Sequence, residues 1–471
     1  MRHTITAVET SCGTPDHEPL HAQVDRRVHD EGRAESCRLV VWGTGRCAQE
    51  FVAHLRPEID VVAFVDGNAS RWGAVLNDRP VVAPATLAEL VYDRLIIASV
   101  YVAEILQQLE SLGLFDPSTT VAYTGPHDSW QCHDLLVSRL FNKLQVGLTT
   151  RCNLVCQHCP RDTDPSVYRD LGLAQFRKYL AGFDPKQFQE FLISDFGENT
   201  ILKDFVAYLR VAKQMGWNQV EFVTNGTNGK RELWETIFGE DLARRVIVSM
   251  ESADPEGFEH VRGFPWARFS KHVATIADCI AKHGRRAELV FNAVCMKSNR
   301  HGLPDIVDFA AQHGAKLYMV HLNPSNTFYN PLGRPENHLD CVPRDEILPI
   351  FREVKRRAAA LGVPLWLPEA FPELDEHAPA IPAEISAAAQ ALRRNELLCT
   401  QPFRWVEVGD NGNVYPCCQM AKRFPVGNLN THTFEEIWNG PGYRRLLDGL
   451  KPGGTPIDVC AQCNMYRGKN F

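Results

Sequence analysis

Short hydrophobic runs alternate with amphipathic or turn-rich stretches along most of the chain. In the first part, residues 39–42, 61–66 and 94–99 are predicted to be buried strands, and a helical or turn-rich stretch separates each from the next. Alternation of strands and helices is typical of a doubly wound parallel sheet. We therefore expect a Rossmann-like domain over residues 37–130.

A longer series of strand-plus-helix units follows between residues 140 and 330. Six segments are predicted to be strands, at 144–150, 190–197, 218–226, 244–250, 287–294 and 315–323. Six such units predict an α/β fold with a partial (β/α)6 barrel. Functional residues of such barrels lie at the carboxyl ends of the strands.

The two ends of the chain, and the segment after the barrel, lack this alternation. Residues 1–36 are polar with few apolar positions, which predicts a flexible N-terminal tail. Residues 331–398 are predicted to be a mainly helical connector. Residues 399–471 form a short, glycine-rich segment with five cysteines. Such a segment is too small and irregular for a large core, so we expect a metal centre to staple this small C-terminal domain.

Composition narrows the classes of function. A formal net charge of −7 provides no broad cationic surface for nucleic acid. The sequence contains no run of about 18 apolar residues, so no membrane span is predicted. No apolar leader is found near residue 1, and we expect a cytoplasmic protein. Fifteen cysteines in a reducing compartment indicate metal or redox chemistry rather than structural disulfides.

Three of these cysteines lie close together after the first predicted barrel strand. Cys152, Cys156 and Cys159 follow a C-x3-C-x2-C spacing. Three thiolates can bind three irons of a cubane and leave the fourth iron open for a small molecule. A structural zinc site is the alternative, but zinc usually takes four protein ligands. The spacing resembles the radical S-adenosylmethionine (SAM) superfamily, whose members reduce SAM at this cluster and release a 5′-deoxyadenosyl radical.

The resemblance extends to further positions in chain order. It implies that Glu198 meets the methionine amine of SAM, that Ser249 contacts the ribose and that Arg262 pairs with the SAM carboxylate, a task suited to a planar guanidinium. His158 would lie near the adenine, and Glu251 stands where relatives often carry Asp. The implied cofactor-binding residues are His158, Gly197, Glu198, Asn225, Ser249 and Arg262.

A second set of cysteines lies in the C-terminal segment. Four thiolates, from Cys399, Cys417, Cys460 and Cys463, would saturate a [4Fe–4S] cluster. Structural zinc is a competitor, and Cys418 is an alternative to Cys417. The pattern resembles the SPASM and twitch extensions of radical SAM enzymes, and the cysteine count favours the twitch type with one auxiliary cluster. The other cysteines are expected to be buried apolar residues, namely Cys12, Cys37, Cys47, Cys132, Cys279, Cys295 and Cys341.

The last predicted barrel strand carries the candidate substrate residues His321 and Asn323, which share one face of a strand. With Glu251 they are the candidate catalytic residues, and Asn292 is a further candidate for the pocket; packing inside the barrel is the alternative. The C-terminal pattern resembles aminoglycoside-biosynthetic radical SAM families, the apramycin-type diol dehydratases and the butirosin-type aminocyclitol dehydrogenases.

That resemblance implies a polyhydroxylated aminosugar substrate and, by the overall domain plan, dehydration. Dehydrogenation of an aminocyclitol and modification of a ribosomal peptide are the alternatives. The implied partners are an electron donor such as flavodoxin or ferredoxin and, for the dehydratase type, a separate NADPH-dependent reductase. No nucleic-acid or membrane partner is expected.

A glycine-rich turn follows the first predicted strand of the chain. Gly43 and Gly45 lie in this turn, Ala48 follows, and Asp66 ends the next strand. The spacing resembles the fingerprint of dinucleotide-binding folds. Nucleotide binding and a Rossmann-like module kept only for docking or substrate recognition both remain open.

Overall fold

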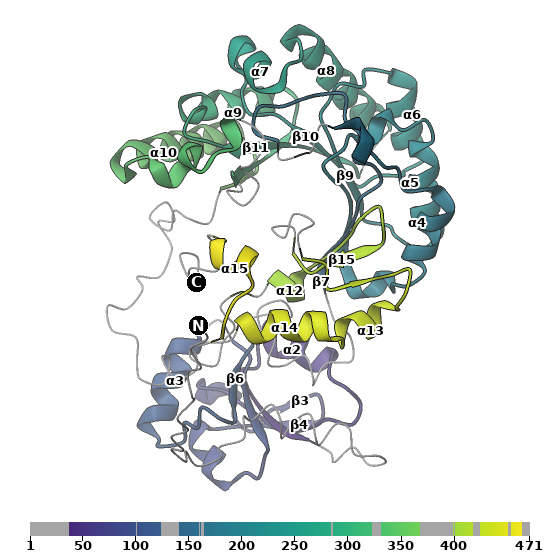
Figure 1. Ribbon diagram of the computed structural model, residues 1–471. Helices are drawn as coiled ribbons and strands as arrows, with labels where there is room; N and C mark the ends of the chain where they lie inside the picture. The colour runs from purple at the N-terminus through teal and green to yellow at the C-terminus, as the bar shows by residue number, and fades with distance from the viewer. Residues whose placement is uncertain are drawn as a thin grey trace, which may run out of the picture.

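In the part of the chain that it describes, the computed structural model contains two β-sheets, which belong to different parts of the sequence (Figure 1). The residues that it describes are 37–99, 101–123, 141–159, 161, 164–283, 286–322, 331–367, 399, 401–417, 424–450 and 454–463. The predicted N-terminal tail at 1–36 lies outside the described residues, as do residues 368–398 of the predicted connector.

The first sheet has six strands in the order β3-β4-β2-β1-β5-β6. Neighbouring strands are parallel except for β3 and β4. Its central strands are the three hydrophobic runs that were predicted to form strands. The bounds are β1 Arg38–Trp42, β2 Asp60–Val65, β3 Val75–Leu76, β4 Arg79–Val82, β5 Arg94–Ile97 and β6 Thr120–Ala122.

Helices cover both faces of this first sheet. Alternate residues of a strand point to opposite faces. Val41 of β1 accordingly packs in a core with Phe51 of α2 (Arg46–Ala53), whereas Val40 packs in a second core with Leu106 of α3 (Val102–Ser111). The 3-10 helices η1 (Ala69–Arg71) and η2 (Pro84–Glu89) connect the remaining strands. The predicted doubly wound parallel sheet is confirmed.

Six consecutive parallel strands, β7 to β12, form the centre of the second sheet. They confirm the predicted partial barrel. Their bounds are β7 Phe141–Val146, β8 Phe188–Ile193, β9 Val220–Thr224, β10 Arg245–Ser249, β11 Glu288–Cys295 and β12 Lys316–His321. The helices between them are α4 Leu173–Leu180, α5 Phe205–Gln214, α6 Arg231–Gly239, α7 Pro255–Arg262, α8 Trp266–His283 and α9 Leu303–Gln312.

The barrel sheet continues beyond these six strands on both sides. Beyond β12, helix α10 (Arg344–Leu361) leads to the short parallel strand β13 (Leu365–Trp366). This part of the predicted helical connector therefore includes a strand of the barrel sheet. None of the helices among the described residues is both long and apolar enough to cross a membrane.

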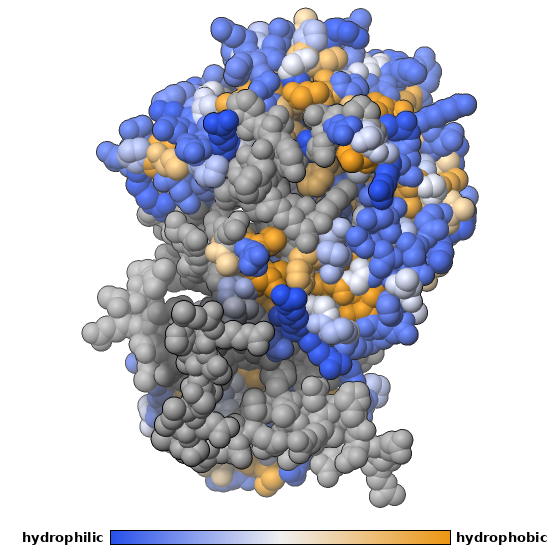
Figure 2. Space-filling view, viewed as in Figure 1, coloured by the Kyte–Doolittle hydropathy of each residue, from blue (hydrophilic) through white to orange (hydrophobic). Residues whose placement is uncertain are grey.

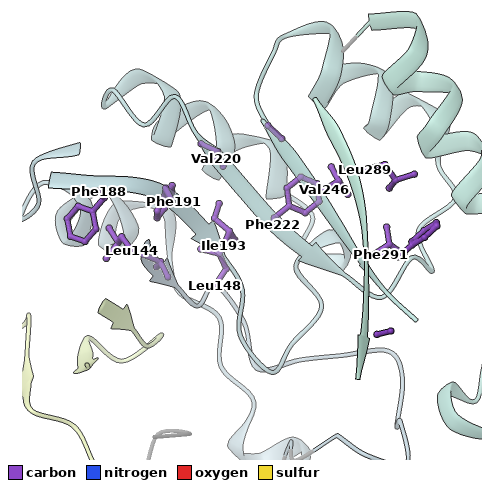
Figure 3. Packing of buried hydrophobic residues seen from close by; sticks show 14 of the residues in the cluster. Leu144, Leu148, Phe188, Phe191, Ile193, Val220, Phe222, Val246, Leu289 and Phe291 are labelled. Atoms are coloured by element: carbon purple, nitrogen blue, oxygen red, sulfur yellow. The ribbon is translucent and has the colours of Figure 1, made fainter. Parts of the chain in front are cut away.

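The two faces of the barrel sheet bury different side chains. Figure 3 shows residues of the main core, among them Phe191, Phe222 and Phe291, which pack together with the helices that follow the strands. The opposite face carries a smaller apolar cluster, which includes Leu192 and Ile247. Helices α4 to α9 form an arc outside the sheet (Figure 1), and hydrophilic residues cover much of their outer surface in Figure 2. Burial of their apolar faces against the sheet accounts for that distribution.

The C-terminal segment joins the barrel sheet. Its strand β14 (Trp405–Val408) pairs in parallel with β7 and leads to the antiparallel strands β15 (Asn413–Tyr415) and β16 (Gly427–Asn428). Phe434 and Tyr443 belong to the main core of the barrel. The expectation of a segment without a large core was therefore wrong, because it shares the core of the barrel. Its helices are α12 Gln401–Arg404, α13 Phe434–Trp438, α14 Pro441–Leu450 and α15 Asp458–Gln462.

Candidate active site

The three cysteines of the C-x3-C-x2-C motif lie on the loop that leaves β7 at its carboxyl end. Cys156 is buried, and Cys152 and Cys159 are half-buried. Burial raises the pKa of Cys159 to about 11; the other two thiols add to this shift, and a hydrogen bond with Arg161 opposes it. Burial also raises the pKa of Cys152. The three thiols are close enough to influence one another electrostatically.

This donor set fits an iron–sulfur cluster. Cysteine binds iron as a thiolate, and a bound metal deprotonates a thiol that is otherwise protonated at neutral pH. Three such thiols lie on one loop and are largely shielded from water, so they are suited to binding an iron–sulfur cluster. Among the described residues, no three His, Cys, Asp or Glu side chains converge on a single metal ion. In a cubane each thiolate binds its own iron, so the three sulfurs need not converge on one point.

Gly197, which follows β8, packs against the start of the cysteine loop. A Cβ atom at this position would collide with the carbonyl oxygens of Thr149 and Arg151. The next residue, Glu198, donates its backbone N–H to the carbonyl oxygen of Arg151 at 2.7 Å. Close backbone packing therefore explains the glycine of the motif.

The carboxylate of Glu198 connects the ends of β8 and β9. It accepts hydrogen bonds from the N–H and hydroxyl of Thr200, from the Thr224 hydroxyl at 2.8 Å and from the Asn225 N–H at 2.5 Å. Burial raises the pKa of Glu198, and these donors oppose the shift. A carboxylate offers about four lone-pair sites, and the four hydrogen bonds match that number. The side chain therefore holds the segments after β8 and β9 together. Its predicted contact with the methionine amine stays a prediction.

Asn225 holds the first cysteine from the end of β9. Its side-chain amide donates to Cys152 Sγ at 3.6 Å and to Asn153 Oδ1 at 2.9 Å. The Asn153 amide in turn donates to the Thr227 hydroxyl at 2.8 Å. Asn153 and Thr227 were not predicted from the sequence, because residues so far apart in the chain give no local spacing signal.

Arg262, the last residue of α7, is buried next to the second cysteine. Its Nε and Nη2 donate to the two carboxylate oxygens of Glu251 at 2.5 and 2.7 Å, and its Nη1 donates to Cys156 Sγ at 3.5 Å. Burial opposes the charge, but Glu251 and Cys156 hold the pKa of Arg262 above its usual value. Nη1 and Nη2 each carry a second N–H, which these bonds do not use. The predicted pairing with the SAM carboxylate would employ those groups, and Glu251 fixes the guanidinium plane.

His158 lies on the cysteine loop beside the same carboxylate. Its Nε2 is 3.5 Å from Oε1 of Glu251. Its Nδ1 is buried and has no hydrogen-bond partner among the described residues. Burial lowers the pKa of His158, and Arg262 lowers it further, whereas Glu251 opposes the shift. The neutral imidazole therefore presents a polar atom that a ligand group could satisfy.

The remaining candidate residues of the barrel strands, one predicted to contact SAM and the others the substrate, lie on different faces of the sheet. Ser249, at the end of β10, is in register with Asn292 of β11, which in turn pairs with Tyr318 of β12. His321 is three residues beyond Tyr318, so strand alternation places it on the opposite face. There its ring stacks on His338 with centroids 5.3 Å apart, and burial, aided by His338, lowers the pKa of His321 to about 4.

The structure thus brings Ser249 and Asn292 together and sets His321 against His338. A catalytic role for His321 stays a prediction. Asn323, predicted to share its strand face with His321, lies outside the described residues.

Three of the four C-terminal cysteines are also close enough to influence one another electrostatically. Burial raises the pKa of Cys460 to about 12, and Cys399 and Cys463 raise it further. Cys417 is buried just after β15, whereas Cys418 lies outside the described residues. The turn before Cys417 has Gly412 at φ +81°, where a Cβ atom would lie 2.5 Å from the Tyr179 hydroxyl oxygen. The donor set again fits a metal cluster bound by thiolates.

The remaining cysteines follow the sequence prediction only in part. Cys279 and Cys295 are buried, as predicted for small apolar residues. Cys37 and Cys47 are half-buried. Cys341 is exposed, so the prediction for it was wrong; it lies in a short 3-10 turn (Leu339–Cys341) with its thiol near the Pro335 carbonyl oxygen. Cys12 and Cys132 lie outside the described residues.

Two family matches cover the two cysteine sets. Residues 146–310 match the radical SAM superfamily, and residues 399–464 match the iron–sulfur cluster-binding domain SPASM. The chain contains a radical SAM domain and a SPASM domain. A third match, described as C2185-like, N-terminal, covers residues 35–116.

Curated relatives match over the radical SAM region. The antilisterial bacteriocin subtilosin biosynthesis protein AlbA of Bacillus subtilis (strain 168) is 24% identical over 65% of this chain and 61% of its own length. A probable GTP 3′,8-cyclase of Methanothermobacter thermautotrophicus is 25% identical over 42% of this chain and 63% of its own length. The chain therefore spans about three-fifths of these relatives.

A solved structure shares the fold. Streptococcus suis SuiB superimposes with a TM-score of 0.52 at 15% identity, covering 79% of this chain and 82% of SuiB. The radical SAM domain implies a [4Fe–4S] cluster and SAM as cofactors, and the SPASM domain implies additional iron–sulfur. Iron is thereby favoured over zinc at the C-terminal cysteines. The number of auxiliary clusters stays a prediction.

Proposed function

We propose that this radical SAM protein reductively cleaves SAM to a 5′-deoxyadenosyl radical and abstracts hydrogen from a polyhydroxylated aminosugar, leading to dehydration. The observation that carries the radical chemistry is the cysteine loop and its three supports. Glu198 binds the loop backbone at Arg151, Asn225 donates to Cys152, and Arg262 donates to Cys156. When bound, the cluster supplies the electron that cleaves SAM. The chain's own residues hold the thiols and orient the polar groups around them.

The residues on the face of the barrel sheet opposite the main core, its inner face, support an aminosugar substrate. Asn292 offers an uncharged amide suited to substrate hydroxyls, and it lies in register beside Ser249, whose predicted contact is the ribose of SAM. Below them, toward the amino ends of the strands, lie Leu192, Ile247 and Val290, which form an apolar floor. Apolar side chains beneath polar ones suit radical chemistry, because water must be excluded from the reacting carbon.

Dehydration is proposed over dehydrogenation because of the domain plan. The aminocyclitol dehydrogenases that the C-terminal spacing resembles are short, whereas this chain adds a complete parallel sheet before the barrel. A dehydration is redox-neutral and requires an acid to protonate the leaving hydroxyl. Glu407 of β14 is a candidate for that proton donor, since strand alternation places it on the same face as Trp405, which packs with Leu192 and Ile247.

Modification of a ribosomal peptide is the second candidate. It is favoured by the match to AlbA, which covers 65% of this chain and whose name places that relative in bacteriocin biosynthesis. The first sheet of this chain argues against it, because a doubly wound parallel sheet differs from the winged-helix domains often used to bind precursor peptides.

One assay separates these candidates. The full chain, reconstituted anaerobically with iron and sulfide, is incubated with SAM, dithionite and aminoglycoside precursors, and products are analysed by mass spectrometry. Loss of one water supports dehydration. Loss of two hydrogen atoms would replace it with dehydrogenation. Cleavage of SAM with no change in any sugar would contradict the aminosugar substrate and favour a peptide. Flavodoxin or ferredoxin can then replace dithionite to test the electron donor.

The cofactor content has its own measurement. Two cubane clusters predict about eight irons per chain after anaerobic reconstitution. A content near four irons together with one zinc would contradict the auxiliary iron–sulfur cluster. A content well above eight would contradict the single auxiliary cluster that the twitch type implies.

A further inference from the structure

A cavity of about 800 Å³ opens at the carboxyl edge of the first sheet, in the N-terminal domain. It is lined by the turn after β1, the end of β2 with η1, and the segment from β5 into α3. Ligand pockets for small molecules typically measure about 300–1,000 Å³. The radical chemistry proposed above assigns nothing to this cavity.

The cavity lies where the topology of the sheet reverses. From β1 the chain moves to β2 on one side, and it later crosses to β5 on the other side of β1. The helices α2 and α3 consequently lie on opposite faces, which leaves a crevice beyond the end of β1. Ligands of open parallel sheets bind in such crevices.

The two glycines of the turn differ in what they require. Gly43 has φ +128°, and a Cβ atom there would lie 2.5 Å from the carbonyl oxygen of Ala98, so packing against β5 demands glycine. Gly45 has φ −80° and ψ −165°, which other residues adopt readily, and a Cβ atom would meet nothing within 4 Å. No contact among the described residues explains Gly45, which lines the cavity. The missing side chain leaves room for a ligand to approach the backbone.

Asp66 forms an ordered polar group on the β2 side of the cavity. Its carboxylate accepts hydrogen bonds from the Thr44 hydroxyl and from the Asn68 N–H at 2.8 Å. Arg71 donates to the Thr44 hydroxyl at 2.7 Å and lies 4.0 Å from the Asp66 carboxylate. These contacts leave part of the acceptor capacity of the carboxylate for the vicinal hydroxyls of a ribose.

The start of α2 is the part of the lining that suits an anion, although Glu50 of α2 and Glu104 of α3 also line the cavity. Helix α2 begins at Arg46 with no side-chain cap and no acidic residue in its first turn. Its first N–H groups and the exposed Arg46 face the same cavity as Gly45. A negatively charged group above Gly45 would meet both the N–H groups and the guanidinium.

We propose that this cavity binds a ribonucleoside diphosphate, with the ribose hydroxyls on Asp66 and the diphosphate over the Gly45 turn. Tyr101, which lines the cavity and is 64% exposed, offers a ring for the base. The moiety can be free or part of a larger nucleotide. One nucleotide fits the site better than two, because only β6 lies beyond β5 on the second side of the sheet.

The test is calorimetric titration of the full chain with ADP, UDP, NAD⁺ and orthophosphate, without SAM or reductant. We expect ADP or UDP to bind at least tenfold more tightly than orthophosphate. Failure of both to do so would overturn the proposal. Binding of NAD⁺ more than tenfold tighter than ADP would also overturn it, because a second nucleotide would then be required. Neither result depends on the radical reaction.

Two variants link binding to this cavity. Gly45→Val fills the space over the turn, and Arg46→Glu replaces the cation by an anion that the helix N-terminus tolerates. Each is expected to weaken nucleoside diphosphate binding at least tenfold. Gly239→Ala is the matched control, since its Cβ atom would also meet nothing within 4 Å but lies at the end of α6 in the barrel. If both pocket variants bind like the parent chain and unfold at its temperature, the cavity is not the site.

Discussion

Buried charges meet at both ends of the barrel strands, but the two sets have different neighbours. At the amino ends, Lys143 of β7 lies 2.8 Å from Glu190 of β8 and 3.0 Å from Glu221 of β9. Arg245 of β10 contacts both glutamates and also Glu288 of β11, at 3.1 Å. Acids and bases from five consecutive strands thus surround one another.

The carboxyl ends carry a smaller group of buried charges, which also contacts a cysteine thiol. Arg262 shares its guanidinium between the carboxylate of Glu251 and the thiol of Cys156. His158 approaches the same carboxylate and keeps Nδ1 without a hydrogen-bond partner among the described residues. Unlike the group at the amino ends, this one combines an ion pair with a metal ligand and an unsatisfied polar atom.

A buried ion pair alone therefore does not identify a functional site. Structural ion-pair networks also perturb pKa values. Lys143 has a raised pKa, since the glutamates outweigh the opposing effect of burial, yet it lies at the amino ends of the strands, where barrel enzymes do not place their chemistry. The three thiols on one loop are what distinguish the carboxyl ends.

The largest effect is expected from the thiols themselves. Replacing Cys152, Cys156 or Cys159 by Ala should abolish formation of 5′-deoxyadenosine, because an incomplete set of ligands does not hold the first cluster. Chromatography of SAM cleavage products under reducing conditions measures this. Cys341→Ala, at an exposed cysteine, is the control and should cleave SAM at the parent rate. Continued cleavage in the three loop variants would remove the central assignment.

The second prediction separates the two charged groups. Arg245→Met removes one of the two cations that Glu190 and the buried Glu221 share and leaves only Lys143 beside them. We expect it to lower the free energy of unfolding by about 3 kcal/mol, the lower end of the range for a broken buried ion pair. Urea titration followed by circular dichroism measures that loss. At 4 °C, where the variant is still folded, its affinity for SAM should equal that of the parent.

Arg262→Met is the matched change at the other end. It strands a buried carboxylate, so it too should lose stability, but it should in addition bind SAM at least tenfold more weakly. Equilibrium dialysis with the reconstituted proteins measures the affinity. If Arg245→Met weakened SAM binding as much as Arg262→Met, the proposed division between a structural and a functional end of the barrel would be wrong.

The parts of this arrangement that the sequence predicts are those with a local signal. The six barrel strands are short apolar runs, and the cysteine loop is a fixed spacing within eight residues, so both were identified without the fold. Gly197 and Glu198 were likewise found as a pair. Their supporting contacts were not, because the Arg151 carbonyl that receives the Glu198 N–H carries no side-chain pattern.

Most of the missed features depend on long-range pairing. Strand β14 was not predicted as part of the barrel, since its partner β7 lies more than 250 residues earlier. The charged group at the amino ends arises only when parallel register brings Arg245 beside Glu221 and Glu288. The Arg262–Glu251 pair spans one loop and one helix, and alternation along a strand could not reveal it. Register and helix docking, rather than local propensity, decide such contacts.

A smaller effect is expected for Glu251, which positions Arg262. Glu251→Gln keeps the shape of the side chain but removes the charge and one acceptor, so the guanidinium loses half of its bidentate partner. We expect SAM to bind about tenfold more weakly, equivalent to about 1.4 kcal/mol. Glu251→Asp should recover part of the affinity, because the carboxylate is retained. An unchanged affinity in Glu251→Gln would show that Arg262 needs no support.

The smallest effect is expected at the edge of the charged group, where Lys316 of β12 lies 2.8 Å from Glu288. Burial would raise the pKa of Glu288, but hydrogen bonds from Lys316 and Arg245 hold it below the ordinary value of 4.5. A lowered glutamate pKa stabilises the fold above the unfolded-state value, and this contribution is lost as pH falls through the folded-state value.

Lys316→Met should therefore cost about 0.5–1 kcal/mol at neutral pH. Because protonated Glu288 no longer needs the cation, the difference between parent and variant should shrink below pH 4.5, as urea titrations at several pH values would measure. A difference that stays constant into acid would mean that Lys316 stabilises the strand through packing of its aliphatic stem rather than through its charge.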